Sequence, residues 1–163
     1  MTIGAYGWDA AGFAAAVADV LPDVFVDVRR RRGLRGRAYG WANGTRLQAM
    51  LDEMSIVYVH RLDVAPSDAT RRIVARDAEA LGIGYRERTS LSDEYLDAYD
   101  REVLQGFDSA AFAAWLGAPA SILLFCVEGP PAACHRSLIA ARLAADLGAT
   151  VEHLLPPAPP GAA

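Results

Sequence analysis

Residues 126–136 read CVEGPPAACHR and hold more chemically reactive side chains than any other window of the chain. These side chains are two thiols, a carboxylate, an imidazole and a guanidinium, from Cys126, Cys134, Glu128, His135 and Arg136. A thiol beside an imidazole at the start of a helix has a lowered pKa and can act as a nucleophile. Glu128 or His135 can then transfer protons. The residue types therefore predict a catalytic site, with Cys126 or Cys134 as the nucleophile.

A second polar group lies much earlier in the sequence, in and after the apolar run 24–28. Asp27 falls within this run, where a carboxylate is costly unless it is paired or lies at the edge of a sheet. Residues 29–37 contain six arginines and no acidic residue, although the whole chain has a net charge of −4. Such a concentrated positive patch favours local binding of an anion. Arg29 and Arg136 can together hold a phosphate through bidentate contacts.

The hydrophobic pattern predicts the elements that position these groups. Strands are expected at 2–4, 24–28, 55–59, 120–126 and 150–154, and helices at 10–21, 45–54, 68–81, 93–104, 109–116 and 137–147. Short apolar strands that alternate with helices indicate an α/β fold. We therefore expect a single three-layer domain over residues 1–155, with a mainly parallel sheet of about five strands and helices on both faces. Residues 156–163 are rich in proline, and we expect them to form a disordered tail.

In a parallel sheet the carboxyl ends of the strands share one edge, and ligands bind in the loops beyond that edge. This arrangement predicts that the two polar groups become neighbours. The residues concerned are Asp27, Arg29, Cys126, Glu128, Cys134, His135 and Arg136. Tyr6 and Trp41 flank the arginine-rich loop, and their rings can stack on a nucleobase. The alternative for Trp41 is packing over the edge of the sheet.

The reactive window also allows a metal site. Cys126, Cys134 and His135, joined by His153 or Glu128, would provide four ligands. However, the spacing C-x7-C-H is not a common zinc pattern, so the sequence predicts neither a metal nor a cofactor. A further alternative is that Cys126 serves only as a small core residue, because it follows an apolar strand.

Composition narrows the class of protein. The chain has 163 residues, and all 16 basic residues are arginines, which excludes chemistry that needs a lysine nucleophile. No apolar stretch reaches the roughly 20 residues that span a bilayer, and no signal peptide is recognisable, so we expect no membrane association. Two cysteines do not form a disulfide framework, which favours the cytoplasm. A homodimer is possible.

With these motifs in hand, the chain resembles the family described as domain of unknown function 488. The matching pieces are TIG at residues 2–4, VDVR at 26–29, IVYVH at 56–60, CVE at 126–128, CHR at 134–136 and VEHL at 151–154. The resemblance implies a small bacterial or archaeal α/β protein with no settled activity. Compared with the family pattern, the chain lacks a histidine after Gly4, and lacks a proline and a serine after Arg29. These differences imply a ligand particular to this branch.

Two hypotheses follow. The first is an enzyme that acts on a phosphate-bearing small molecule, a nucleotide, a nucleoside or nucleic acid, with Asp27, Arg29, Arg136, Tyr6 and Trp41 in the binding site. The second is a non-catalytic anion-binding or nucleic-acid-binding regulatory domain that uses the same edge. A rhodanese-like thiol enzyme is a more distant alternative, because the arginine that would close such an anion loop after Cys126 is replaced by Ala132.

Overall fold

The computed structural model describes residues 1–34 and 36–157. Its centre is a five-stranded sheet in which every pair of neighbouring strands is parallel. The strands are β1 (Thr2–Gly4), β2 (Val24–Asp27), β3 (Val57–His60), β4 (Ile122–Cys126) and β5 (His153–Leu154), in the order β3-β2-β4-β1-β5. The three central strands are almost wholly buried, because helices cover both faces of the sheet.

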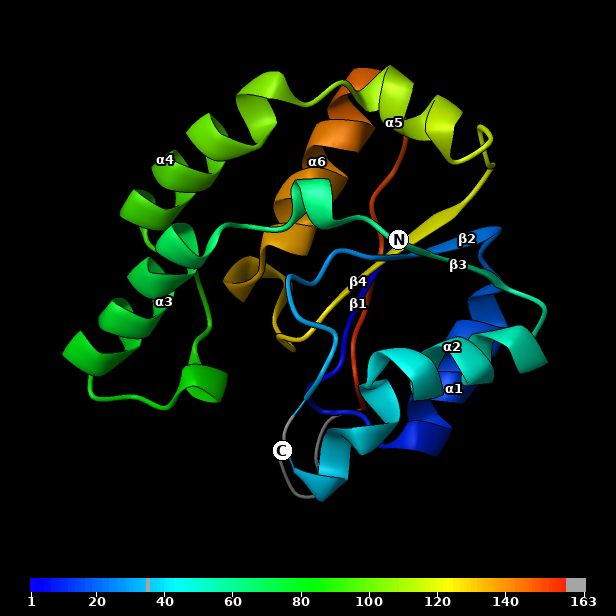
Figure 1. The fold of residues 1–163 in the computed structure, drawn as a ribbon, viewed down its shortest axis with the longest axis horizontal. Coiled ribbons are helices and arrows are strands. Elements are labelled where there is room, and N and C mark those ends of the chain that lie inside the picture. The colour runs from blue at the N-terminus through cyan, green and yellow to red at the C-terminus, as the bar shows by residue number, and fades with distance from the viewer. Residues whose placement is uncertain (35, 158–163) are drawn as a thin grey trace.

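Helices cover the two faces unequally (Figure 1). One face carries α1 (Ala10–Val20) and α2 (Gly44–Glu53), at the lower right of the view. The other carries α3 (Asp68–Ala80), α4 (Asp93–Glu102), α5 (Ser109–Trp115) and α6 (His135–Leu147). Short 3-10 helices connect these elements at Arg37–Ala42, Leu62–Val64, Tyr85–Glu87, Leu104–Gly106 and Pro131–Ala133. The predicted three-layer α/β domain, its mainly parallel sheet and its number of strands are confirmed.

Successive residues of β2 and β4 face opposite layers, as the period of two in a strand requires. Phe25 and Phe125 pack into the core beneath α1 and α2. Val26, Leu124 and Cys126 pack into the other core, beneath α3 to α6. Asp27 is aligned with Phe125 in the register of the two strands. The polar groups that follow these strands therefore reach the same edge of the sheet from different faces.

Some boundaries differ from the sequence prediction. The last long helix begins at His135 rather than at residue 137, because Cys134 has extended backbone angles and occupies the N-cap. The arginine-rich segment predicted as a loop includes the 3-10 helix Arg37–Ala42. Of the tail expected to be disordered, residues 158–163 lie outside the described residues. Among the described helices, none combines the length and the apolar character needed to cross a membrane.

Gly4 lies at the point where β1 passes closest to the reactive loop. A Cβ atom at this position would lie 1.9 Å from the carbonyl oxygen of Glu128. Just after it, the backbone N–H of Tyr6 donates to the carbonyl of Val127 over 2.9 Å. The absence of a side chain at Gly4 thus lets the loop after β4 lie directly against β1.

We predict that Gly4→Ala destabilises the protein by about 1–3 kcal/mol, because the new methyl group overlaps backbone atoms that cannot rotate away. Urea denaturation of the variant and the wild type measures the difference. Gly33→Ala is the matched control, since a Cβ at Gly33 meets nothing within 4 Å. Equal stability of the Gly4 variant and the control would show that the loop adjusts freely.

Candidate functional site

Three ligand-type atoms meet at the carboxyl end of β4. They are Cys126 Sγ, Cys134 Sγ and His135 Nδ1, and all lie within 4.8 Å of one another. His135 Nδ1 is 4.0 Å from the sulfur of Cys126 and 3.9 Å from that of Cys134. All three side chains are buried, and both cysteines are free thiols. The structure thus brings together three of the five residues of the reactive window.

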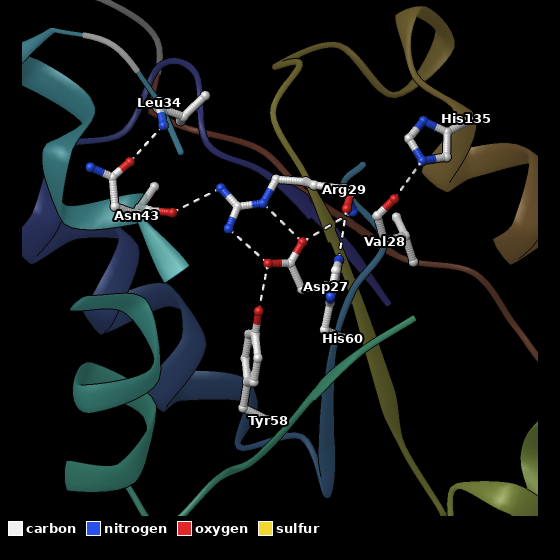
Figure 2. A network of polar contacts seen from close by, with 9 residues as sticks. Asp27, Val28, Arg29, Leu34, Asn43, Tyr58, His60 and His135 are labelled. Atoms are coloured by element: carbon white, nitrogen blue, oxygen red, sulfur yellow. Dashed lines mark hydrogen bonds and ion pairs between the residues drawn. The ribbon is translucent and has the colours of Figure 1, made fainter. Parts of the chain in front are cut away.

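The ring of His135 is oriented from its other side. Its Nε2 lies 3.0 Å from the carbonyl oxygen of Val28, an acceptor, so Nε2 carries a proton and donates it (Figure 2). The ring of Tyr99 packs against the imidazole at 5.6 Å between centroids. The Tyr99 hydroxyl in turn donates to the carbonyl of Val64 over 2.7 Å. These contacts direct Nδ1 of His135 towards the two sulfur atoms.

The two thiols influence each other's protonation. Burial raises the pKa of Cys126 above its usual range, and the neighbouring sulfur of Cys134 raises it further. Burial also acts to raise the pKa of Cys134, but the hydrogen bond from Cys126 and the charge of His135 outweigh it and lower this pKa. Burial lowers the pKa of His135, yet the negative charge on Cys134 raises it overall. The pKa values of the two thiols are therefore shifted in opposite directions, raised for Cys126 and lowered for Cys134.

Glu128 lies beside this cluster. Its Oε2 is 3.2 Å from Cys126 Sγ, and its Oε1 accepts a hydrogen bond from the hydroxyl of Tyr85 over 3.2 Å. The guanidinium of Arg88, almost fully buried, lies 3.5 Å from the same Oε1. Burial raises the pKa of Glu128, and the charge on Cys134 adds to the effect. The carboxylate thus faces both a thiol and two hydrogen-bond donors.

Arg136 is fully buried and contacts the backbone of the reactive loop. Its Nη1 donates to the carbonyl of Glu128, and its Nη2 donates to the carbonyl of Gly129 over 2.7 Å. It contacts the backbone of Glu128 and forms no ion pair with the carboxylate. In this structure the guanidinium holds the loop in place.

Asp27 and Arg29 form a buried ion pair (Figure 2). The pair lies on the face of the sheet that α1 and α2 cover, opposite the cluster of Cys126, Cys134 and His135. Arg29 Nε and Nη2 donate to the two carboxylate oxygens over 2.8 and 2.7 Å, and Nη1 donates to the carbonyl of Ala42. The Tyr58 hydroxyl donates to Asp27 over 2.7 Å, and its pKa is raised to about 12 by burial and by the Asp27 charge. The guanidinium of Arg29 is therefore occupied by partners within the protein, whereas Arg136 has partners for Nη1 and Nη2 but none for its buried Nε.

A cavity of about 470 Å³ opens over this edge of the sheet. Its lining combines reactive, cationic and aromatic side chains with a few apolar residues, namely Tyr6, Arg29, Arg30, Arg31, Gly33, Leu34, Pro66, Arg71, Tyr85, Cys126, Val127, Glu128 and His135. Cys134 is buried and is not one of the residues that line it. Trp41 is also absent from the lining; its ring packs against Phe13 at 4.5 Å between centroids. A hollow of about 610 Å³ elsewhere is lined mainly by apolar residues, including some of α5, β4 and α6, and its lining has no thiol, carboxylate or imidazole side chain.

Residues 13–143 match the family model described as Domain of unknown function DUF488. The chain belongs to this family. The match includes both the Asp27–Arg29 pair and the loop with Cys126 and His135, so it covers the whole candidate site except Tyr6. The resemblance seen in the sequence motifs is confirmed. Comparisons with curated proteins and with solved structures found no match.

Membership of the DUF488 family leaves the activity open. Three site residues, Arg71, Tyr85 and Arg88, were missed by the sequence analysis. Tyr85 and Arg88 come from the connection between α3 and α4, some forty residues before the glutamate that they contact. No local pattern in this connection marks it as part of the site. Only the placement of the connection over the sheet edge brings it to Glu128.

We predict that Asp27→Asn destabilises this DUF488 protein by about 3–5 kcal/mol, because the buried Arg29 charge loses its counter-charge. Chemical denaturation followed by circular dichroism measures the loss. Asp63→Asn is the matched control: Asp63 also pairs with an arginine, but its side chain is 57% exposed, and its loss should cost at most about 1 kcal/mol. A loss of similar size in both variants would contradict the role given to the buried pair.

Proposed function

We propose that this protein is an enzyme that acts on a small phosphate-bearing ligand, such as a nucleotide, at the carboxyl edge of the sheet. The observation that carries the proposal is the composition of one cavity. Solvent-facing arginines line one part of it, and Glu128, Cys126 and His135 line another. A ligand bound by its anionic group would therefore place its remaining atoms against the reactive side chains.

The arginines that can bind the anion are Arg30, Arg31 and Arg71 rather than the two buried ones. Arg30 and Arg31 are exposed, and Arg71 is half-buried. Arg31 and Arg71 share Asp68, at 3.4 and 3.0 Å, in a pair open to solvent. Such exposed pairs are weak, so a phosphate can compete for the guanidinium groups. Arg29 and Arg136 support this surface by fixing the backbone beneath it.

Glu128 is the acid–base group of the proposed enzyme. It lines the cavity and lies within hydrogen-bonding distance of the Cys126 thiol. The hydroxyl of Tyr85 and the guanidinium of Arg88 fix its orientation. The ring of Tyr6 also lines the cavity, and the guanidinium of Arg86 lies over this ring, 4.6 Å from its centroid. The free thiols are suited to a reducing cytoplasm, where we expect the enzyme to act.

We predict that at least one compound from a panel of inorganic phosphate, sulfate, nucleotides and short oligonucleotides raises the unfolding midpoint of the wild type. The double variant Arg30→Ala/Arg31→Ala should bind that compound about tenfold more weakly or worse, because charge-assisted hydrogen bonds are lost. Isothermal titration calorimetry measures the affinities. Arg101→Ala, which removes an exposed arginine outside the cavity, should bind as the wild type does. Unchanged affinity in the double variant would exclude this anion site.

A non-catalytic anion-binding domain would use the same cavity. A substitution of Glu128 distinguishes this function from that of an enzyme. We predict that Glu128→Gln keeps the affinity for the bound compound within about threefold but lowers its turnover at least about 100-fold, because the amide cannot accept a proton. Product formation followed by chromatography measures the turnover. If the wild type converts none of the compounds that it binds, the protein is a binding domain.

A further inference from the structure

We propose that Cys126, Cys134 and His135 form a metal site that holds one zinc ion. The three donor atoms are Cys126 Sγ, Cys134 Sγ and His135 Nδ1, the combination of two sulfurs and one nitrogen that zinc prefers. The site deepens the proposed function, since it gives the cluster of thiols and imidazole beside Glu128 the role of binding a metal ion. The existence of the site does not depend on that function.

The distances between the donor atoms fit a shared ion. A tetrahedral zinc with bonds of about 2.3 Å to sulfur and about 2.1 Å to nitrogen separates its ligand atoms by about 3.6–3.8 Å. His135 Nδ1 lies 4.0 and 3.9 Å from the two sulfur atoms, and no two of the three donors are more than 4.8 Å apart. Side-chain movements of a few tenths of an ångström up to about 1 Å would place all three around one ion.

The histidine is held as a metal ligand requires. A metal-binding imidazole usually donates its other N–H to a carbonyl or a carboxylate, which fixes the ring and the free nitrogen. Here Nε2 of His135 donates to the carbonyl of Val28, and Nδ1 is directed towards both sulfur atoms. This hydrogen bond exists without any ion, so the ring needs no reorientation to bind one.

Two neighbouring residues can bind one ion here because of the local backbone. Cys134 is the N-cap of α6, with φ −143° and ψ 137°, and His135 is the first residue of the helix. The change from extended to helical backbone turns both side chains towards Cys126 at the end of β4. The spacing C-x7-C-H looked unsuitable for zinc because a sequence does not show this change of backbone conformation between Cys134 and His135.

Three protein ligands leave one position of a tetrahedral zinc open, and this open position indicates which reaction the site would support. Glu128 is not one of the three clustered donors, but it lies 3.2 Å from Cys126 Sγ and lines the cavity with Cys126 and His135. Three protein ligands with an open position are typical of catalytic zinc, which binds a water there and lowers its pKa. Glu128 is placed to accept the proton of that water, leaving hydroxide for a hydrolytic reaction. In this arrangement the thiolates are ligands and not nucleophiles.

The test measures the metal itself. Full-length protein purified from zinc-containing medium should contain about one zinc per chain by inductively coupled plasma mass spectrometry. After removal of zinc with a chelator, added Co²⁺ should give the near-ultraviolet absorption of thiolate-bound cobalt and the visible bands of a tetrahedral ion. Cys126→Ser, Cys134→Ser and His135→Gln should each weaken zinc binding at least about 100-fold. His153→Gln, which changes an exposed histidine, should bind zinc as the wild type does.

The cobalt spectrum of the wild type keeps the test valid if a buried variant fails to fold. A wild type that binds no zinc and gives no thiolate–cobalt absorption would overturn the proposal. So would a Cys126–Cys134 disulfide in the purified protein, or a zinc content unchanged in all three ligand variants. Because zinc and cobalt binding are measured without any phosphate compound, the metal site and the anion site can fail separately.

Discussion

The buried ion pair of Asp27 and Arg29 is the interaction on which the rest of the site depends. Removing both charges from water is costly, and the cost is offset only because the carboxylate receives donors from Arg29 and Tyr58 while the guanidinium also reaches Ala42. The pair fixes the backbone at the end of β2. The carbonyl of Val28, between the two charged residues, then points to the other face of the sheet and accepts the hydrogen bond from His135.

The edge of the sheet thus carries two groups of polar residues, one on each face, with different roles. On the face of α1 and α2, the ion pair is buried, and the Arg29 guanidinium lies over the ring of Phe125. On the face of α3 to α6, the thiols, the imidazole and Glu128 lie beneath an open cavity. Arg136 holds the loop of Glu128 on this second face by donating to the carbonyl of Glu128. One strand end therefore supports a rigid network on one side and reactive groups on the other.

The sequence predicted much of this structure. Apolar runs and helix caps gave the order of the elements, the parallel sheet and the edge where the polar groups meet. It could not show that Asp27 and Cys126 face opposite layers, because that depends on the register that aligns Asp27 with Phe125. It also gave no sign of Tyr85 and Arg88, whose role depends on tertiary placement. For the same reason, the sequence could not show that the guanidinium groups of Arg29 and Arg136 donate to partners within the protein.

The order of the strands has a consequence for how the protein folds. The partners of β1 are β4 and β5, so Thr2 is aligned with Leu124 and with His153 at the other end of the chain. Contacts between residues so distant in sequence form slowly, because a long loop must close before they contribute any energy. During synthesis the first strand therefore stays unpaired in the sheet until β4 has been made. The reactive edge needs β4 seated between β2 and β1, so it can form only once these long-range contacts have been made.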